Sequence, residues 1–303
     1  MQEFTIKTEF SKVDIIIVSY YDGDILFQCI NNLLLLKNLG QIILVNNGNS
    51  LVDEVRIHQI VESNSKITLL SGHGDVGFAK ACNMGSNIAN EAFIFFLNPN
   101  YAISDINILH KLIDSLDSNQ YKAATCLVLG GDNTIQANCR RNLLTPLILI
   151  NETLKLYNLC GKFKRLNLSL DEIENLPNIS ELPALSSIAI FTTKEYFEQI
   201  KGFDESYFLG VEDLDISMRI KINGDKIAFV KNAVVKHLPN NNDKHNELSE
   251  VYKARGNIIY IQKFFPKFNN VILGSCLKIL IGLRYMLNVY AIRRYNNRPT
   301  SNK

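Results

Sequence analysis

Three features that mark other protein classes are missing from this chain of 303 residues. The first 250 residues contain no stripe of lysine and arginine, and the net charge is only +2, so we expect no nucleic-acid partner. The six cysteines include no Cys-x-x-Cys pair and no zinc-like spacing, which predicts buried, reduced thiols in a cytosolic protein. The N-terminal residues 1–14 contain no apolar segment, and we therefore expect no signal peptide.

The first hundred residues alternate between short apolar runs and segments with helical spacing. Strands are predicted at 14–19, 41–45, 66–70 and 92–97. Helices are predicted at 24–38, from the turn at 46–50 through about 62, and at 77–90. This alternation predicts an α/β fold with a mostly parallel central sheet flanked by helices. Ligands of such sheets bind beyond the carboxyl ends of the strands. Those ends are 19–20, 46–47, 71–77 and 98–100.

The later part of the chain is less regular. Short strands are expected near 123–129 and 186–192, helices at 194–200 and 212–222, and a pair of strands within 226–235 that ends at His237. The stretch 142–182 mixes helical patterns with proline-bounded loops, and we expect it to contact an acceptor or to join domains. The domains are predicted as 1–245, a catalytic domain, and 246–303, a helical extension.

The C-terminal extension differs in kind from the rest of the chain. A helix is predicted at 250–265, and the apolar segment 271–292 follows with two internal cations, Lys278 and Arg284. These cations disfavour a transmembrane helix, and basic residues follow the segment, so an amphipathic helix on an anionic membrane surface fits better. The alternative is a core-packing or dimerisation helix. The expected location is cytoplasmic, peripheral at the inner face of the membrane.

A glycine-rich motif raises one competing function. The stretch Gly72–Gly77 reads Gly-x-Gly-x-x-Gly between a predicted strand and a helix, as in nicotinamide-dependent oxidoreductases. The motif follows the third strand rather than the first, and the acidic residue about 20 positions on, Glu91, opens the next strand instead of ending it. These two details argue against a dinucleotide site, although the glycines remain suited to a nucleotide or its diphosphate.

An acidic cluster gives a more specific signal. Glu212, Asp213 and Asp215 crowd one predicted helix N-terminus, with Asp204 on its approach. Acids favour helix N-termini in any protein, which accounts for part of the cluster. Adjacent carboxylates also suit general-base catalysis, in which one takes a proton from a hydroxyl group while its neighbours tune or orient it.

Taken in order along residues 13–265, a set of motifs resembles family 2 glycosyltransferases, and specifically a bacterial branch similar to rhamnosyltransferases. The matching pieces are Val-Asp-Ile-Ile-Ile-Val-Ser-Tyr at 13–20, Val-Asn-Asn-Gly-Asn-Ser at 45–50, Gly77–Gly85, Phe96–Asn100, Gly202–Glu205, Glu212–Asp215 with Arg219, and His237. The resemblance implies a GT-A fold and an inverting single displacement.

The resemblance also implies roles for individual residues. Ser19, Tyr20, Asn47 and Asn98 would line the nucleotide pocket. Gly77 would lie beside the diphosphate, which Lys80 or the helix terminus would help to neutralise. Asp213 would be the general base, located at the cleft formed by the first, second and fourth strand ends, with Glu212 and Asp215 supporting it or binding acceptor hydroxyls.

The metal motif departs from the family pattern. Where the family has Asp-x-Asp or Asn-x-Asp, this chain has Asn98-Pro99-Asn100, without a carboxylate. A Mg²⁺ or Mn²⁺ ion would be held weakly by Asn98, Asn100, His237 and the donor diphosphate, with His237 equally open to a structural role. Alternatively Lys80, Arg140 or Arg141 neutralises the leaving group, or the protein only binds. We expect an active enzyme whose metal is weak or dispensable.

These features lead to one preferred function and one alternative. The preferred partners are a nucleotide-sugar donor, dTDP-rhamnose or else a UDP-hexose, and a saccharide or lipid-linked saccharide acceptor in bacterial surface polysaccharide synthesis, such as O-antigen. The alternative is a non-catalytic module that binds a nucleotide sugar or a glycan and has lost its metal motif.

Overall fold

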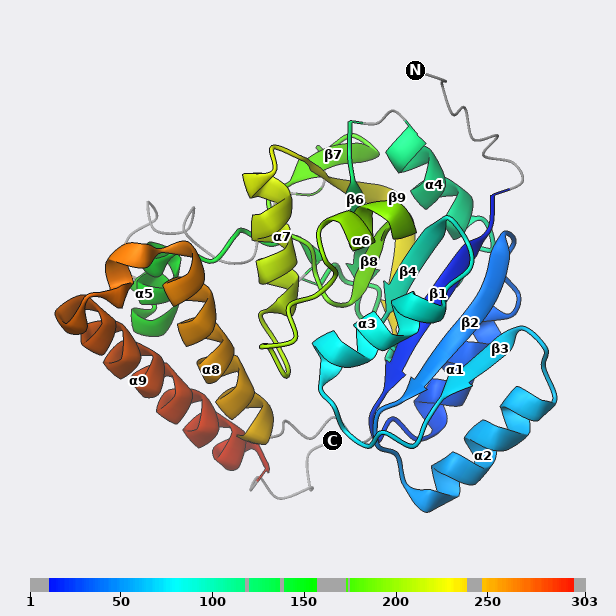
Figure 1. The fold of residues 1–303 in the computed structure, drawn as a ribbon, viewed down its shortest axis with the longest axis horizontal. Coiled ribbons are helices and arrows are strands. Elements are labelled where there is room, and N and C mark those ends of the chain that lie inside the picture. Colours follow the sequence, from blue (N-terminus) through cyan, green and yellow to red (C-terminus); the bar gives the residue numbers. More distant parts are fainter. Residues whose placement is uncertain are drawn as a thin grey trace.

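A computed structural model describes residues 11–117, 120–136, 139–156, 173, 175–238 and 247–296. Within these ranges one nine-stranded sheet lies between helices, and a helical hairpin lies to one side of it (Figure 1). The α/β fold with a C-terminal helical extension is therefore confirmed.

The first half of the sheet is parallel. Strands β3, β2, β1 and β4 lie side by side in that order. Every residue of β1 is buried, which explains its uninterrupted β-branched run. Because parallel strands end at the same edge, the polar residues after β1, β2 and β4 are brought together there. The elements are β1 (Val13–Ser19), α1 (Asp24–Leu33), β2 (Leu39–Asn46), α2 (Leu51–Glu62), β3 (Ile67–Leu70), α3 (Phe78–Ile88) and β4 (Phe93–Leu97).

The second half makes the sheet mixed rather than mostly parallel. Strand β8 lies between β4 and β6 and is antiparallel to both, whereas β6 and β9 are parallel. Strands β5 and β7 pair antiparallel with β9. The elements are β5 (Tyr101–Ile103), α4 (Ile108–Asp117), β6 (Ala123–Leu129), α5 (Pro146–Leu154), β7 (Ile179–Leu182), β8 (Ala189–Thr193), α6 (Lys194–Gln199), α7 (Glu212–Ile222) and β9 (Ile227–His237).

The strand pair expected within 226–235 is a single strand, β9. Its pairing with β6 jumps from Cys126 opposite Val230 to Leu127 opposite Val234, so the intervening residues bulge out of register. The polar residues Lys231 and Asn232 fall in this bulge. They break the apolar pattern of the sequence without ending the strand.

The C-terminal residues form a helical hairpin with its own small core. Helix α8 (Glu247–Phe264) connects through the 3-10 turn η5 (Pro266–Asn269) to α9 (Val271–Asn296), and α5 packs against α9 (Figure 1). Tyr260, Ile261, Leu277 and Ile281 form a buried cluster with residues of α5 and α7. The domain boundary predicted at 245 lies outside the described residues.

Helix α9 has two unlike faces. Leu277 and Ile281 are buried against the hairpin core, whereas a second apolar stripe is exposed to solvent. That stripe consists of Val271, Ile272, Leu273, Ile279, Leu283, Met286, Leu287 and Tyr290. By length and composition the segment Val271–Arg294 is the one helix among the described residues that could cross a membrane, and only 17% of its most apolar window is buried.

Candidate active site

A cavity of about 180 Å³ opens at the carboxyl ends of β1, β2 and β4. This strand-end cavity is bordered by the sheet on one side and by a loop and helix α8 on the other. Its lining residues are Val18, Tyr20, Asp22, Asn47, Asp75, Gly77, Phe78, Asn98, Pro99, Phe208, Leu209, Leu248, Ser249 and Tyr252. The position is the one at which open α/β sheets bind their ligands.

Hydrogen bonds from Asn47 organise one wall of the strand-end cavity. Its amide nitrogen donates to Asp75 Oδ1 at 2.8 Å, and its carbonyl oxygen accepts from the backbone N–H of Val76 at 3.0 Å. Burial raises the pKa of the Asp22 carboxyl to about 6, although the backbone N–H of Tyr20 donates to it at 3.0 Å. The cavity therefore carries one acid that titrates close to neutral pH.

Position 77 requires a glycine because of its backbone conformation and because of the close approach of Phe208. Its φ of +84° lies in the left-handed region, and a Cβ atom there would come within 2.7 Å of the backbone oxygen of Phe208. That oxygen accepts a hydrogen bond from the N–H of Phe78, the first residue of α3, at 2.8 Å. The Phe208 ring in turn stacks on Tyr252 of α8 at 4.3 Å between centroids. The N-terminus of α3 is thus fixed against the cavity.

Two residues expected in the nucleotide pocket do not line the strand-end cavity. Ser19 is fully buried, and its hydroxyl accepts a hydrogen bond from the Asn49 amide at 3.0 Å. Lys80 is exposed on α3. Tyr20, Asn47, Gly77 and Asn98 do line the cavity, so four of the six expected positions are brought together.

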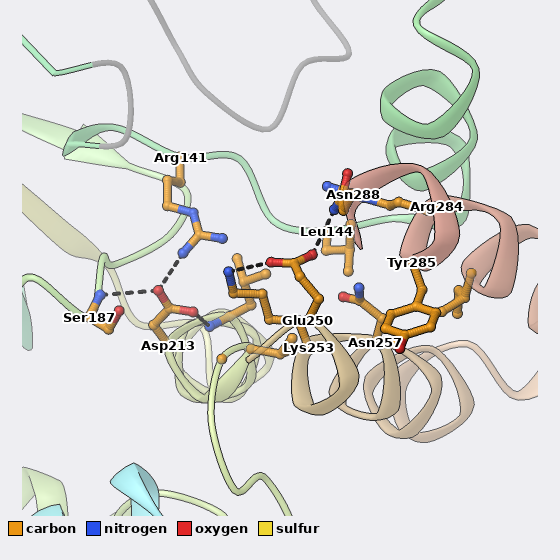
Figure 2. A pocket seen from close by; sticks show the side chains of 15 residues that line it. Arg141, Leu144, Ser187, Asp213, Glu250, Lys253, Asn257, Arg284, Tyr285 and Asn288 are labelled. Carbon is orange, nitrogen blue, oxygen red and sulfur yellow. Dashed lines mark hydrogen bonds and ion pairs between the residues drawn. The ribbon is translucent and has the colours of Figure 1, made fainter. Parts of the chain in front are cut away.

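A second cavity, of about 270 Å³, lies between the sheet domain and the hairpin and is lined by Asp213 (Figure 2). In this Asp213 cavity, Asp213 and Arg141 lie at one end, Arg284 and Tyr285 at the other, and Glu250 with Lys253 between them (Figure 2). The remaining lining residues are Leu144, Ser187, Gly210, Val211, Leu214, Ala254, Asn257, Ile281 and Asn288. Asp213 therefore does not line the strand-end cavity, although the loop Phe208–Val211 borders both cavities.

Three donors hold the Asp213 carboxylate. Oδ2 accepts from the Arg141 guanidinium and from the Ser187 N–H, the latter at 3.1 Å, and Oδ1 accepts from the Leu214 N–H at 2.8 Å. A carboxylate offers about four acceptor positions. By this count one acceptor position remains on Oδ1, on a residue that is only 1% exposed.

The backbone before Asp213 is strained. Val211 is the N-cap of α7 and adopts φ +82°, which is unfavourable for a β-branched residue. The next residue, Glu212, is 2% exposed, and its Oε2 has no hydrogen-bond partner among the described residues. Burial raises the pKa of Glu212 to about 8, and the charge of Asp213 adds to the effect. Burial therefore favours the protonated form of Glu212.

Asp215 does not line either cavity. Its oxygens accept from Lys263 at 2.6 Å, Arg219 at 2.7 Å and the Tyr207 hydroxyl at 3.1 Å, and the residue is fully buried. Because Lys263 belongs to α8, this cluster ties α7 to the hairpin. The acid holds α7 in place, and these donors engage both of its oxygens.

The three residues expected to bind a metal ion form an incomplete set. Only Asn98 lines the strand-end cavity, and its Oδ1 already accepts from the N–H of Asn100 at 2.9 Å. The Asn100 amide oxygen is buried without a hydrogen-bond partner in the described part of the chain, and the His237 ring packs on Tyr101. No described group of three His, Cys, Asp or Glu side chains could hold a metal ion. These uncharged donors do not fit a resident Mg²⁺ or Mn²⁺ site.

Several residues that line the two cavities are not among the expected site residues. Asp75 stands inside the glycine motif and Asp22 follows the first strand, so both lie where a strand-end argument could have found them. Lys253 and Arg284 lie more than 30 residues beyond the acidic cluster, on the hairpin. Only the docking of α8 and α9 brings them to Asp213. Arg141, expected to act on a leaving group, instead pairs with Asp213.

Comparison with protein families gives one match. The family model described as Glycosyl transferase family 2 matches residues 14–167, slightly more than half of the chain. Comparison with curated protein sequences finds no match.

Solved structures with a similar fold include several glycosyltransferases. A structure of GalNAc-T7 with UDP, GalNAc and Mn²⁺ aligns with TM-score 0.60 at 17% identity, covering 82% of this chain and 48% of that one. The mannosyltransferase PcManGT from Pyrobaculum calidifontis, in complex with GDP-Man and Mn²⁺, aligns with TM-score 0.57 at 12% identity, covering 91% and 70%. S. aureus TarS 1-349 with UDP-GlcNAc aligns with TM-score 0.53 at 13% identity, covering 83% and 71%. The chain thus spans about half the length of GalNAc-T7, and the likeness concerns the GT-A-like fold.

Proposed function

Because the chain belongs to glycosyl transferase family 2, we propose that it moves a sugar from a nucleotide-sugar donor onto a hydroxyl group of a saccharide acceptor. The observation that carries this proposal is Asp213, a buried carboxylate that lines a cavity and accepts three hydrogen bonds from described donors. The strand-end cavity would hold the donor, and the Asp213 cavity would hold the acceptor.

The donor fits the strand-end cavity through its nucleotide and its diphosphate. Aromatic and polar side chains such as Tyr20 and Asn47 border the space, as a nucleoside requires. The N-terminus of α3 faces the same space at Gly77, and the dipole of this helix favours a diphosphate, while the N–H groups of Gly77 and Phe78 already donate to Asp75 and Phe208. This helix terminus replaces Lys80 as the expected source of positive charge. The favoured donor is dTDP-rhamnose, with a UDP-hexose as the alternative.

The chemistry is an inverting single displacement. The acceptor hydroxyl donates to Oδ1 of Asp213 and transfers its proton there as its oxygen attacks the anomeric carbon. The bond from that carbon to the diphosphate breaks, and the nucleoside diphosphate leaves with the electron pair. Arg141 and the Ser187 N–H keep the carboxylate oriented. Glu212, protonated next to it, adds no second negative charge, and Asp215 fixes the helix.

The acceptor is proposed to be carried on a lipid at the inner face of the cell membrane. The exposed apolar stripe of α9 supports this, because isolated exposed apolar residues are ordinary but a continuous stripe indicates a binding surface. Such a helix would lie in the membrane interface, with the Asp213 cavity on its other side. An acceptor in bacterial surface polysaccharide synthesis has this form.

The test compares Asp213→Asn with the wild type in two measurements. Calorimetry with dTDP and UDP should give the same affinity for both proteins, because Asp213 does not line the strand-end cavity. The rate of sugar transfer or donor hydrolysis should fall about 100- to 10,000-fold, the usual contribution of a general base. The exposed substitution Asp114→Asn is the matched control and should change neither. Transfer by Asp213→Asn at the wild-type rate would refute the assignment.

One observation favours a second candidate, a non-catalytic module that binds a nucleotide sugar or a glycan. The sequence at 98–100 supplies no carboxylate for a metal ion that would neutralise the leaving diphosphate. The wild type decides between the two. Binding of nucleotide sugars without any turnover, across dTDP, UDP, GDP and CDP donors and with Mg²⁺ and Mn²⁺ supplied, would favour the module.

A further inference from the structure

Three cationic side chains and two acidic side chains line the Asp213 cavity. Arg141 pairs with Asp213, and Lys253 pairs with Glu250 at 2.8 Å. The fifth charged lining residue, Arg284, makes no hydrogen bond or close ion pair with any residue that the structure describes, and its charge acts on the Glu250 carboxylate without contacting it. A guanidinium on a cavity wall, half-buried and without such a partner, is a binding group for an anion.

Neutral donors stand beside this guanidinium. Asn257 of α8 and Tyr285 of α9 line the same end of the cavity, and neither side chain is hydrogen-bonded within the described ranges (Figure 2). The nearest acid, Glu250, is already engaged by Lys253 and by the Asn288 amide at 2.7 Å, so its repulsion of a bound anion is reduced. Donors from two helices line this end of the cavity, and a phosphate offers three acceptor oxygens to such donors.

We propose that Arg284 determines acceptor specificity by binding a phosphate or diphosphate group that the acceptor carries, an inference that rests on the proposed transferase function. Arg284 and Asp213 lie at opposite ends of one cavity of about 270 Å³, close to the lower limit of ordinary ligand pockets (Figure 2). A phosphate held at Arg284 leaves the rest of that space for a sugar whose hydroxyl reaches Asp213.

The phosphate group has two possible sources. A membrane-borne acceptor would present it at the hairpin, because the opposite face of α9 is the exposed apolar stripe. A soluble sugar phosphate would present the same chemistry from solution. Both kinds of acceptor would place a charged phosphate ester at Arg284. The experiment below distinguishes the membrane-borne from the soluble acceptor.

The first arm of the test uses inorganic pyrophosphate and the full chain. Calorimetry is done with the strand-end cavity filled by a saturating nucleoside diphosphate, so that pyrophosphate reports on the Asp213 cavity. Arg284→Gln should weaken binding at least about tenfold, as expected for loss of a charged hydrogen bond. Lys278→Gln removes the same charge from an exposed position on the same helix and should bind as the wild type does. Equal binding by wild type and Arg284→Gln, or none by the wild type, overturns the proposal.

The second arm identifies the source. Phosphatidylcholine vesicles containing a polyprenyl diphosphate sugar are compared with vesicles containing phosphatidylglycerol at equal charge, and with soluble sugar phosphates. An Arg284-dependent preference for the polyprenyl diphosphate supports the lipid source, and one for the soluble ester supports the other. Equal dependence on Arg284 for both vesicle types means that the residue only senses surface charge, which overturns the proposal. Failure of the transferase itself appears separately, as a wild type that shows no turnover with any nucleotide sugar, whether or not it binds one.

Discussion

Replacing Glu212 by glutamine should make the protein more stable in alkaline solution. Glu212 is 2% exposed, one of its oxygens has no hydrogen-bond partner among the described residues, and Asp213 is its neighbour. Burial and that neighbouring charge raise its pKa from 4.5 to about 8. Glutamine has nearly the shape of the protonated acid and does not ionise.

The sign and size of the effect follow from proton linkage. In the unfolded chain Glu212 loses its proton near pH 4.5, whereas in the folded protein it keeps the proton until about pH 8. Between these values the folded state binds more protons, so the free energy of unfolding falls as the pH rises. Each unit of pKa difference is worth about 1.4 kcal/mol, which gives a loss on the order of 5 kcal/mol in the wild type between pH 4.5 and about pH 8. Glu212→Gln should escape this loss.

The assay is denaturant unfolding at pH 5.5, 7 and 9. The difference in unfolding free energy between Glu212→Gln and the wild type should grow in favour of the variant from pH 5.5 to 9, because titrating groups that do not interact with Glu212 cancel in the difference. Glu62→Gln, at an exposed position at the end of α2, should show no such growth. A difference for Glu212→Gln that stays constant with pH would refute the reasoning.

Three further predictions concern the cavities and the hairpin. Gly77→Ala should lower the free energy of unfolding by about 1–3 kcal/mol more than Gly224→Ala does. Both glycines have φ above +80°, but only Gly77 has a backbone atom within 3 Å of the added methyl group. Equal losses of unfolding free energy in denaturant would contradict this. Asn100→Asp should tighten Mn²⁺ binding about tenfold by supplying a charged ligand, and unchanged calorimetric affinity would speak against a cation near this loop. Leu283→Glu should reduce sedimentation with phosphatidylglycerol vesicles, whereas Val52→Glu, which also places an acid at an exposed apolar position but on α2, should not. Equal partition of both variants and the wild type rejects the membrane surface.

The parallel half of the sheet is predictable because its strands are buried on both faces. The run of β-branched residues in β1 has no solvent-facing position, so composition alone identifies it. Helix α1 is predicted to continue to residue 38 but ends at Leu33. Residues 33–36 are all leucine, and a uniform apolar run contains no information about where a helix stops. Strands β5 and β7, of three and four residues, are too short to give a periodic pattern.

The strand-end cavity follows from local sequence, and the Asp213 cavity does not. Tyr20, Asn47 and Asn98 each stand directly after a strand, so parallel pairing alone brings them to one edge. The surroundings of Asp213 depend on segments distant in sequence, including Arg141, Ser187 and the hairpin. From sequence spacing alone, Asp213 and Asp215 are equally good candidates for the general base. Only the packing distinguishes them, because the oxygens of Asp215 accept hydrogen bonds from Lys263 and Arg219.

Helix α8 forms a common partition between the two cavities. Leu248, Ser249 and Tyr252 face one of them, and Glu250, Lys253 and Asn257 face the other, within less than three turns. Any tilt of this partition enlarges one compartment at the expense of the other. The preferences for the two substrates therefore cannot evolve independently of each other. Exchanging the hairpin between homologous chains should transfer both preferences together.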